Sequence, residues 1–298
     1  MTNHSELISE PSVTREILKK HGFTFKKSLG QNFLTNPALL EQMVSAANLT
    51  PEDQVLEIGP GIGALTQLLA QRAQKVVALE IDQRLLPILA DTLAAYDNVT
   101  VRNQDVLKVA LPEFLATEFD LNRPIKVLAN LPYYITTPIL LKLIAATDEL
   151  AEIIVMMQYE VAQRLIAEPG HKTYGSLSVA VQMNMDAEIA VKVPKTAFIP
   201  QPKVDSAIVR LTALKDPLIP AADKLAFNNF VQIVFKQRRK RLLNNLIQHF
   251  GGGSEAKQKF SDCLAKVDLS PDIRAEALSI TELYGLFTIL LKDGYKLI

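Results

Sequence analysis

Short apolar runs alternate with longer segments in which apolar positions recur at helical spacing. The apolar runs predict buried strands, and the spaced segments predict amphipathic helices. The strands expected up to about residue 213 are 54–58, 75–81, 98–105, 125–130 and 151–158, and the helices are 37–49, 64–73, 83–96 and 137–147. Strands alternating with such helices are typical of right-handed βαβ units and a parallel sheet. Two further strands, 188–193 and 206–214, are expected to close the sheet as a hairpin.

The pattern changes after residue 213, where only helical spacing remains. Three amphipathic helices are expected there, at 221–250, 254–267 and 280–295, with the loop GGGS between the first two. The chain is therefore predicted to form a doubly wound α/β domain followed by a small all-helical domain. The expected division is an N-terminal arm at 1–25, the α/β domain at 26–213 and the helical domain at 214–298.

Composition narrows the class of protein. Hydrophobic residues make up 48% and charged residues 21% of the chain, which describes a soluble globular protein and not a disordered one. The apolar runs are too short to span a bilayer, and the N-terminus lacks the pattern of a signal peptide. Cys263 is the single cysteine, which excludes an internal disulfide, and the four histidines are scattered. We therefore expect a cytoplasmic protein that uses neither a metal nor a membrane.

Charge is balanced overall, with 32 basic and 32 acidic residues, but the basic residues form two clusters. KKHGFTFKK spans residues 19–27, and KQRRKR spans residues 236–241. Such runs are commonly solvated faces, and they are also what phosphate contacts require. The candidate contacts to nucleic acid are Lys26, Lys27, Arg238, Arg239 and Lys240.

A glycine-rich turn follows the first predicted strand in the segment LEIGPGIGALT. Gly59 and Gly61 permit a tight turn and a close approach of the backbone to a ligand near a helix N-terminus. Glu80, at the end of the second strand, can accept hydrogen bonds from both ribose hydroxyls of NAD or of S-adenosylmethionine. These residues do not distinguish the two ligands, and a simple tight turn beside a surface acid is a further interpretation.

Two acidic residues favour the methyl donor over NAD, although neither is decisive. Glu57 precedes the glycines, where a dinucleotide site usually continues with apolar residues. Asp105, at the end of the third strand, can accept a hydrogen bond from an adenine amino group. Four candidate residues lie at the ends of predicted strands, namely Gly59, Glu80, Asp105 and Asn130. The carboxyl edge of a parallel sheet, where these strand ends meet, is where such folds bind ligands.

The fourth strand ends in Asn130-Leu131-Pro132-Tyr133, which is more than a plain turn requires. The exocyclic amine of a purine is a poor nucleophile because its lone pair is delocalised, so it needs orienting and not a strong base. The Asn130 side-chain oxygen and the Leu131 carbonyl can accept the two amine hydrogens. Tyr133 offers a stacking face worth roughly 1–3 kcal/mol. The motif predicts a socket for a flipped-out adenine, and a strand-to-helix turn is the alternative.

Taken together, these segments make the chain resemble the small-subunit ribosomal RNA adenine-N6,N6-dimethyltransferases of the KsgA type. The similarity runs in order through KKSLGQNFLTN, VLEIGPGIGALT, VVALEID, NQDVL, NLPYYITTPI, MMQYEVAQRL, YGSLSV, VPKTAFIPQPKVDSAIVRL and FKQRRKRLLNNL. GQNFL and FIPQPKVDS are specific to this group and its close relatives, whereas the glycine loop is widespread. In one departure, Leu242-Leu243 follows KQRRKR where threonine-leucine is more usual, which affects the detail of RNA contact and not the class.

The resemblance implies a Rossmann-like class I S-adenosylmethionine-dependent methyltransferase domain and a helical C-terminal domain that binds RNA. Asn32 and Leu34 would close over the methyl donor. Gly59 would contact the methionine portion of the donor, Glu80 its ribose and Asp105 its adenine amine. Asn130 would contact both the donor and the target base. Phe198 would stack on the target adenine opposite Tyr133, although a core aromatic is the alternative for this residue. The implied reaction makes N6,N6-dimethyladenosine at two adjacent adenosines in a hairpin loop near the 3′ end of 16S rRNA. The implied partner is that RNA within a 30S assembly intermediate, bound by a monomeric enzyme.

Other functions remain open from the sequence. Antibiotic-resistance methyltransferases of large-subunit rRNA favour Asn-Ile-Pro-Tyr and a shorter C-terminal domain, so Leu131 and the length after residue 213 favour the small-subunit enzyme. A ribosome-assembly factor or transcription factor that kept the fold could lose donor residues, yet every expected one is present. An NAD-dependent enzyme would leave the Asn130 and Phe198 segments unexplained. DNA N6-adenine methylases usually carry proline at the position of Leu131.

Overall fold

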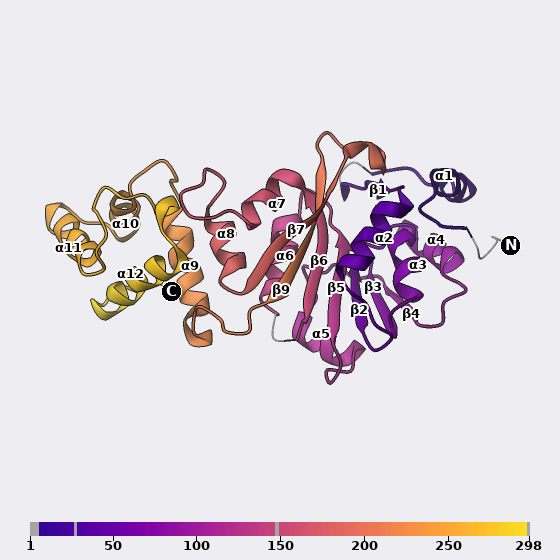
Figure 1. The fold of residues 1–298 in the computed structure, drawn as a ribbon, viewed down its shortest axis with the longest axis horizontal. Coiled ribbons are helices and arrows are strands. Elements are labelled where there is room, and N and C mark those ends of the chain that lie inside the picture. The colour runs from indigo at the N-terminus through magenta and orange to yellow at the C-terminus, as the bar shows by residue number, and fades with distance from the viewer. Residues whose placement is uncertain (1–5, 27–28, 147–148, 297–298) are drawn as a thin grey trace. The chain divides into compact units, whose positions relative to one another are not determined.

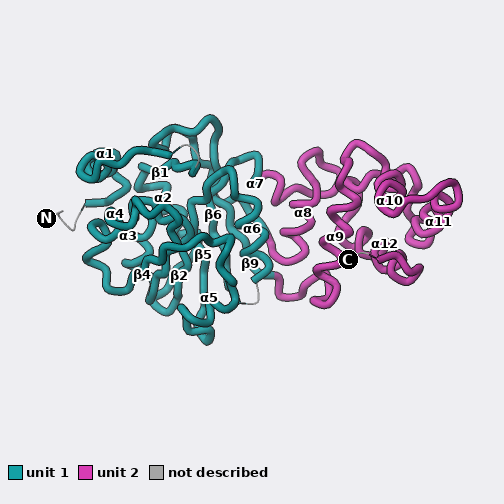
Figure 2. The backbone as a smooth tube through the Cα atoms, turned by 180° about the vertical axis from the view of Figure 1, so that it is seen from behind, with its two compact units in different colours: residues 1–162, 187–213 teal, residues 163–186, 214–298 magenta. Residues whose placement is uncertain are grey.

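The computed structural model describes residues 6–26, 29–146 and 149–296. Contacts divide the chain into two compact units, shown in Figure 2. Unit 1 comprises residues up to 162 together with 187–213, and unit 2 comprises 163–186 together with 214–298. Residues 163–186 thus belong with the helical unit by contacts, whereas the expected division placed them in the α/β domain. The prediction that the helical domain binds RNA is independent of this boundary.

The described residues form a seven-stranded sheet with the order β4-β3-β2-β5-β6-β9-β7 (Figure 1). The strands are β2 (Gln54–Ile58), β3 (Lys75–Leu79), β4 (Val99–Arg102), β5 (Ile125–Asn130), β6 (Glu152–Gln158), β7 (Met185–Val193) and β9 (Ser206–Ala213). The five strands β2 to β6 pair in parallel, and β9 runs antiparallel to β6. The strand order reverses between β2 and β5. A crevice is therefore expected at the carboxyl ends of these two strands.

Helices connect the parallel strands. They are α3 (Ala64–Ala70), α4 (Leu86–Thr92) after a short 3₁₀ turn η2 (Gln83–Leu85), α5 (Leu111–Glu118) and α6 (Thr136–Ile144), with α2 (Pro37–Ala46) before β2 and α7 (Tyr159–Leu165) after β6. The spacing of apolar residues predicts α2, α3, α4 and α6, whereas α5 and α7 are not among the helices expected from the sequence. The start of α2 is set by Asn36, whose side chain accepts the Leu39 N–H at 3.1 Å, and by proline at the first helical position. Buried side chains of α2 and α3 form one apolar core cluster with residues of β2, β5 and β6.

The N-terminal segment packs against the α/β domain. Helix α1 (Pro11–Lys20) buries Ile17 and Leu18 in a cluster that also holds Phe33 and Leu89. Strand β1 (Phe33–Leu34) pairs with β8 (Phe198–Ile199) in a two-stranded antiparallel sheet, with Leu34 opposite Phe198. This small sheet joins segments more than 160 residues apart, and no local pattern in the sequence predicts it.

Unit 2 is helical and has its own aromatic core. Its helices are α8 (Ser176–Gln182), α9 (Lys224–Val234), α10 (Leu242–Phe250), α11 (Ser254–Ala265) and α12 (Ile280–Lys292). Phe227, Phe230, Phe260 and Phe287 are fully buried and lie in one apolar cluster. Three ring contacts link Phe227, Phe230 and Phe287 to one another, with centroids 5.4–6.2 Å apart.

The prediction of one continuous helix at 221–250 is wrong. Helix α9 ends at Val234 and α10 begins at Leu242, so the cluster KQRRKR lies in the turn between them. A helix through this cluster would bring like charges together three and four residues apart, which is unfavourable. The buried Asn245 side chain instead donates to the carbonyls of Val234 at 2.7 Å and Gln237 at 3.3 Å, which satisfies the end of α9. Among the described residues, no helix combines the length and the apolar character that crossing a membrane requires.

Candidate active site at the carboxyl edge of the sheet

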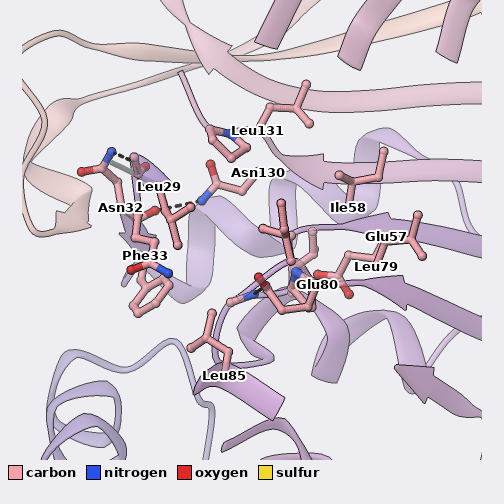
Figure 3. A pocket seen from close by; sticks show the side chains of 18 of the residues that line it. Leu29, Asn32, Phe33, Glu57, Ile58, Leu79, Glu80, Leu85, Asn130 and Leu131 are labelled. Carbon is pink, nitrogen blue, oxygen red and sulfur yellow. Dashed lines mark hydrogen bonds between the residues drawn. The ribbon is translucent and has the colours of Figure 1, made fainter. Parts of the chain in front are cut away.

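A pocket opens where β2, β3 and β5 end (Figure 3). Its volume is about 1070 Å³, counted with the open solvent at its mouth. The turns after these strands, the segment 104–106 beyond β4 and the N-terminal segment 29–34 form its walls. Every residue predicted to bind the methyl donor lines this pocket, and so do Leu131 and Tyr133. The residues predicted to bind the donor are Asn32, Leu34, Gly59, Gly61, Glu80, Asp105 and Asn130.

The glycine turn gives the pocket a floor of bare backbone. Gly59 has φ +69°, and a Cβ atom added there would meet nothing within 4 Å, so its backbone borders open space. Gly61 has φ +62°, and a Cβ atom there would lie 3.0 Å from a ring atom of Phe33. The first glycine therefore exposes backbone to a ligand, and the second lets Phe33 pack against the turn.

Glu80 follows β3 and is only 4% exposed. Its Oε1 accepts the Asp82 N–H at 2.7 Å, and its Oε2 accepts the Gly61 N–H at 3.4 Å. Burial raises the pKa of Glu80 from 4.5 to about 7, although these backbone donors partly offset the effect. These two hydrogen bonds fix the carboxyl group at the pocket wall.

Glu57, inside β2, is a second buried acid in the pocket wall. It is 1% exposed, and no described residue hydrogen-bonds to its Oε2. Burial raises its pKa to about 8, and the nearby charge of Glu80, visible beside it in Figure 3, adds to this. Sequence reasoning used Glu57 to choose between ligands but did not count it among the site residues. An acid within an otherwise apolar strand was the available signal.

Asp105 lies three residues beyond the end of β4, because the strand is shorter than predicted and ends at Arg102. Its Oδ1 accepts the Leu107 N–H at 3.0 Å, which holds the side chain at the turn. It lines the pocket with its neighbours Gln104 and Val106. The residue therefore reaches the predicted place through a turn and not as the last residue of a strand.

The Asn130 side chain is oriented by the N-terminal segment. Its Nδ2 donates to the Asn32 carbonyl at 3.0 Å, the hydrogen bond drawn between them in Figure 3. A carbonyl can only accept, so the amide orientation is set and Oδ1 is left as an acceptor. The Leu131 N–H donates to the Met156 carbonyl at 3.1 Å, and no described donor occupies the Leu131 carbonyl. Two neighbouring acceptors are thus available at the end of β5.

Tyr133 is held by its hydroxyl, which lies 2.5 Å from the Ser206 Oγ at the start of β9. Burial raises the pKa of Tyr133, so the phenol stays neutral over the physiological range. The half-buried ring lines the pocket next to Leu131. An aromatic ring fixed at its far end is suited to stack on a planar base.

Phe198 does not lie where the resemblance implies. It is 3% exposed and belongs to the apolar core cluster with Leu34 and Leu40, and it is not part of the pocket wall. The structure therefore brings together Asn130, Leu131 and Tyr133 but leaves Phe198 in the core. Its stacking on a target adenine stays a prediction that needs movement of the β8 segment.

The basic residues predicted to contact RNA differ in whether other side chains of the protein pair with them. Lys27 lies outside the described residues, and Lys26 is exposed. Arg238 donates to the Lys172 carbonyl and pairs with Glu276 at 3.3 Å. Arg239 and Lys240 are exposed and have no ion pair with any described residue, so their charges are available to a partner. Among the described residues, no group of three or more His, Cys, Asp or Glu side chains could hold a metal ion.

The sheet order, the glycine turn, the buried acids and the amide at the end of β5 define a Rossmann-like methyltransferase. A family model described as ribosomal RNA adenine dimethylase matches residues 22–287, and the chain belongs to that family. It is therefore an enzyme that methylates adenine in ribosomal RNA.

Curated relatives match nearly the full length. The chain is 50% identical to ribosomal RNA small subunit methyltransferase A of Enterococcus faecalis, over 98% of this chain and 99% of the relative. It is 52% identical to the protein of that name from Ligilactobacillus salivarius, over 99% of each.

Solved structures agree with the fold. A dimethyladenosine transferase from Plasmodium falciparum superposes with a TM-score of 0.74 at 28% identity, covering 89% of this chain and 100% of the other. The 23S rRNA methyltransferase ErmE superposes with a TM-score of 0.65 at 26% identity, covering 87% of this chain and 99% of the ErmE chain. The predicted family and fold class are thereby confirmed, while the roles of individual site residues stay predictions.

Proposed function

We propose that the enzyme transfers methyl groups to N6 of two adjacent adenosines in a hairpin loop near the 3′ end of 16S rRNA, giving N6,N6-dimethyladenosine. The names of the relatives at about half identity support a small-subunit substrate. The observation that carries the chemistry is the pair of free acceptors, Asn130 Oδ1 and the Leu131 carbonyl, beside the fixed ring of Tyr133. A planar base with an exocyclic amine is the ligand that this arrangement suits.

The proposed methyl donor is S-adenosylmethionine, which supplies an electrophilic methyl group on a sulfonium sulfur when it is bound. The residues of the pocket fit it. Glu80 offers an anchored carboxylate for ribose hydroxyls, and Gly59 offers open backbone. The unpartnered Oε2 of Glu57 suits a positively charged ammonium group. Asp105 would accept from the adenine amine, and Asn32 and Leu34 would close the pocket from the N-terminal side.

Orientation, and not base catalysis, is what the protein contributes to the transfer. Hydrogen bonds to Asn130 and Leu131 would turn the amine so that its lone pair leaves the ring plane and faces the donor. Stacking on Tyr133 holds the ring without depending on the number of amine hydrogens. A monomethylated adenine can therefore stay bound by stacking and one hydrogen bond while it accepts a second methyl group.

The partner and setting are part of the same proposal. We propose that the substrate is 16S rRNA within a 30S assembly intermediate and that a single copy of the enzyme acts on it in the cytoplasm. The loop adenines must be accessible to flip into the pocket, which favours a particle that is not yet complete. Arg239 and Lys240, like the exposed Lys26, are available to meet phosphate, because no described acidic residue pairs with them.

Mass spectrometry of nucleosides tests the reaction. The intact enzyme should convert an under-methylated 30S particle to one containing N6,N6-dimethyladenosine, and primer extension should map the product to two adjacent adenosines. Asn130→Ala should abolish both transfers. Asn122→Ala, in an exposed turn after α5, is the matched control and should change nothing. Monomethyladenosine as the only product after exhaustive reaction would contradict the account of the pocket. Product in 50S but not 30S particles would contradict the substrate.

A further inference from the structure

Two residues that line or adjoin the pocket have no part in the proposed chemistry, yet they are linked by a short hydrogen bond. The Gln31 Nε2 donates to Asp82 Oδ2 at 2.7 Å. Gln31 belongs to the N-terminal segment and lines the pocket, whereas Asp82 follows β3 and is 5% exposed. A buried carboxylate that hydrogen-bonds to a distant segment of chain, and does not line the pocket, requires an explanation.

Asp82 is joined on one side to the donor pocket. Its backbone N–H donates to Glu80 Oε1 at 2.7 Å, so its main chain helps to fix the acid proposed to bind ribose. Its side chain is then clamped by Arg84, which donates from Nε to Oδ1 at 2.9 Å and from Nη2 to Oδ2 at 2.6 Å. These hydrogen bonds lower the pKa of Asp82 although burial opposes the effect, and the carboxylate is therefore ionised at neutral pH.

Gln31 and Arg84 also secure the N-terminal segment. The Gln31 Oε1 accepts the Lys26 N–H at 3.2 Å. Arg84 donates from Nη1 to the Thr24 carbonyl at 2.9 Å, and its guanidinium lies 4.9 Å from the ring centroid of Phe23. The segment is thus tied to the loop after β3 at two separate places by buried or half-buried groups.

The next residue along the segment reaches the reacting end of the pocket. Asn32 follows Gln31 directly, and its carbonyl accepts the Asn130 Nδ2 hydrogen bond at 3.0 Å. Three hydrogen bonds, together with the covalent chain from Gln31 to Asn32, therefore connect Glu80 to Asn130. Displacing Gln31 would move the carbonyl that orients the Asn130 amide.

We propose that Asp82 and Gln31 form a latch that positions the Asn130 amide and couples it to the donor site. This inference rests on the proposed function. Gln31 and Asp82 are positioning residues, since they act through Asn32 and Glu80 and not on the target base. Arg84 keeps the Asp82 carboxylate charged and pointed at Gln31. Filling of the ribose site at Glu80 would favour the latched arrangement, and an unlatched segment would leave the amide free to turn.

An exchange of donor and acceptor tests the latch. Gln31→Glu places a second carboxylate against Asp82, and the repulsion should displace the segment. The expected result is a roughly ten- to hundredfold loss of kcat, because small misplacements at a reacting centre have effects of that size. KM for the RNA particle should stay within about twofold, since the RNA contacts are left in place. Gln31→Glu combined with Asp82→Asn restores one donor and one acceptor at this contact with the same total charge. It loses the acceptor that Asp82 Oδ2 offers to Arg84 Nη2, so it should recover part of the lost kcat.

The controls separate positioning from stability. Glu41→Gln breaks another carboxylate–arginine pair, with Arg72 at 2.8 Å and 3.0 Å, that has no link to the N-terminal segment, and it should leave kcat unchanged. Melting curves for every variant show whether the assay temperature lies below unfolding. Gln31→Ala serves if Gln31→Glu does not fold, and it should also lower kcat. A normal kcat in the Gln31 variants, or an exchanged pair no better than Gln31→Glu alone, would overturn the latch. Failure of the intact enzyme in the same assay would instead overturn the proposed function.

Discussion

Glu57→Gln should change how the stability of the ligand-free enzyme depends on pH. Glu57 is fully buried in β2, and its pKa rises from 4.5 to about 8 in the folded protein. Between these values the unfolded chain has released the proton while the folded protein keeps it. Stability that this group contributes is therefore present below pH 4.5 and is lost as pH rises toward 8. Glutamine has nearly the same shape and no titration, so it removes this dependence.

The magnitude follows from the size of the shift. One bound proton of difference changes the free energy of unfolding by about 1.4 kcal/mol per pH unit. Between pH 5.5 and 7.5, the free energy of unfolding of the intact protein should fall by about 2–3 kcal/mol relative to that of the Glu57→Gln variant. The slope is the informative quantity, because a constant difference in the hydrogen bonding of amide and carboxylic acid cancels between two pH values. Glu80 and the other titrating groups are common to both proteins, and their contributions cancel to first order.

Urea unfolding at several pH values, without the methyl donor, measures the difference. The free energy of unfolding of the variant should rise steadily relative to that of the intact protein from pH 5.5 upward, and the difference should level off above about pH 8. Glu16→Gln, the same change at an exposed position of α1, should give a curve parallel to that of the intact protein. Parallel curves for Glu57→Gln as well would refute the reasoning, because they would mean that the Glu57 carboxyl ionises near its ordinary pKa despite its burial.

Three further changes address the remaining residues of the proposal. Glu80→Ala should weaken S-adenosylmethionine binding by about tenfold or more, since hydrogen bonds to a charged acceptor are lost, and unchanged calorimetric affinity would remove Glu80 from the donor site. Replacing Arg239 and Lys240 with alanine should lower the log–log salt slope of RNA binding by roughly two units, whereas the internally paired Arg238 should contribute less when it is replaced alone. Phe198→Leu removes volume from the core and should reduce stability by about 1–3 kcal/mol. It should also let monomethyladenosine accumulate in the nucleoside assay, and an unchanged product ratio would assign this ring to the core alone.

The parts of the fold that are predictable from the sequence are those set by local chemistry. The strands β2, β3, β5 and β6 appear as apolar runs because both faces of a parallel sheet are buried, and Asn36-Pro37 marks the start of α2. The helix at 221–250 fails for two reasons, namely repulsion between like charges in KQRRKR and a side-chain contact from α10. The amide of Asn245 closes the end of α9 from eleven residues further on, and hydropathy does not register such a contact.

The same distinction explains what the sequence reveals of the site. Carboxyl ends of adjacent parallel strands meet at one edge, so Gly59, Glu80 and Asn130 can be placed together without coordinates. Phe198 cannot be placed in this way, because its position depends on the pairing of β8 with β1. That pairing puts the ring opposite Leu34 in the core, whereas the motif alone favours a place beside the target base.

The Asn-Leu-Pro-Tyr motif supplies the acceptors for an amine but not the contact that aims them. Asn130 could turn its amide either way at the end of β5, and only the Asn32 carbonyl, 98 positions earlier in the chain, decides which end faces the pocket. Asn32 is in turn held by its neighbour Gln31, through an acid that also fixes Glu80. Under this proposal, the reactivity of the motif depends on the N-terminal segment being closed. A chain with an intact Asn-Leu-Pro-Tyr sequence but a displaced segment would bind a base and orient its amine poorly. The proposal therefore counts the GQNFL segment as part of the methyl-transfer site together with the turn after β5.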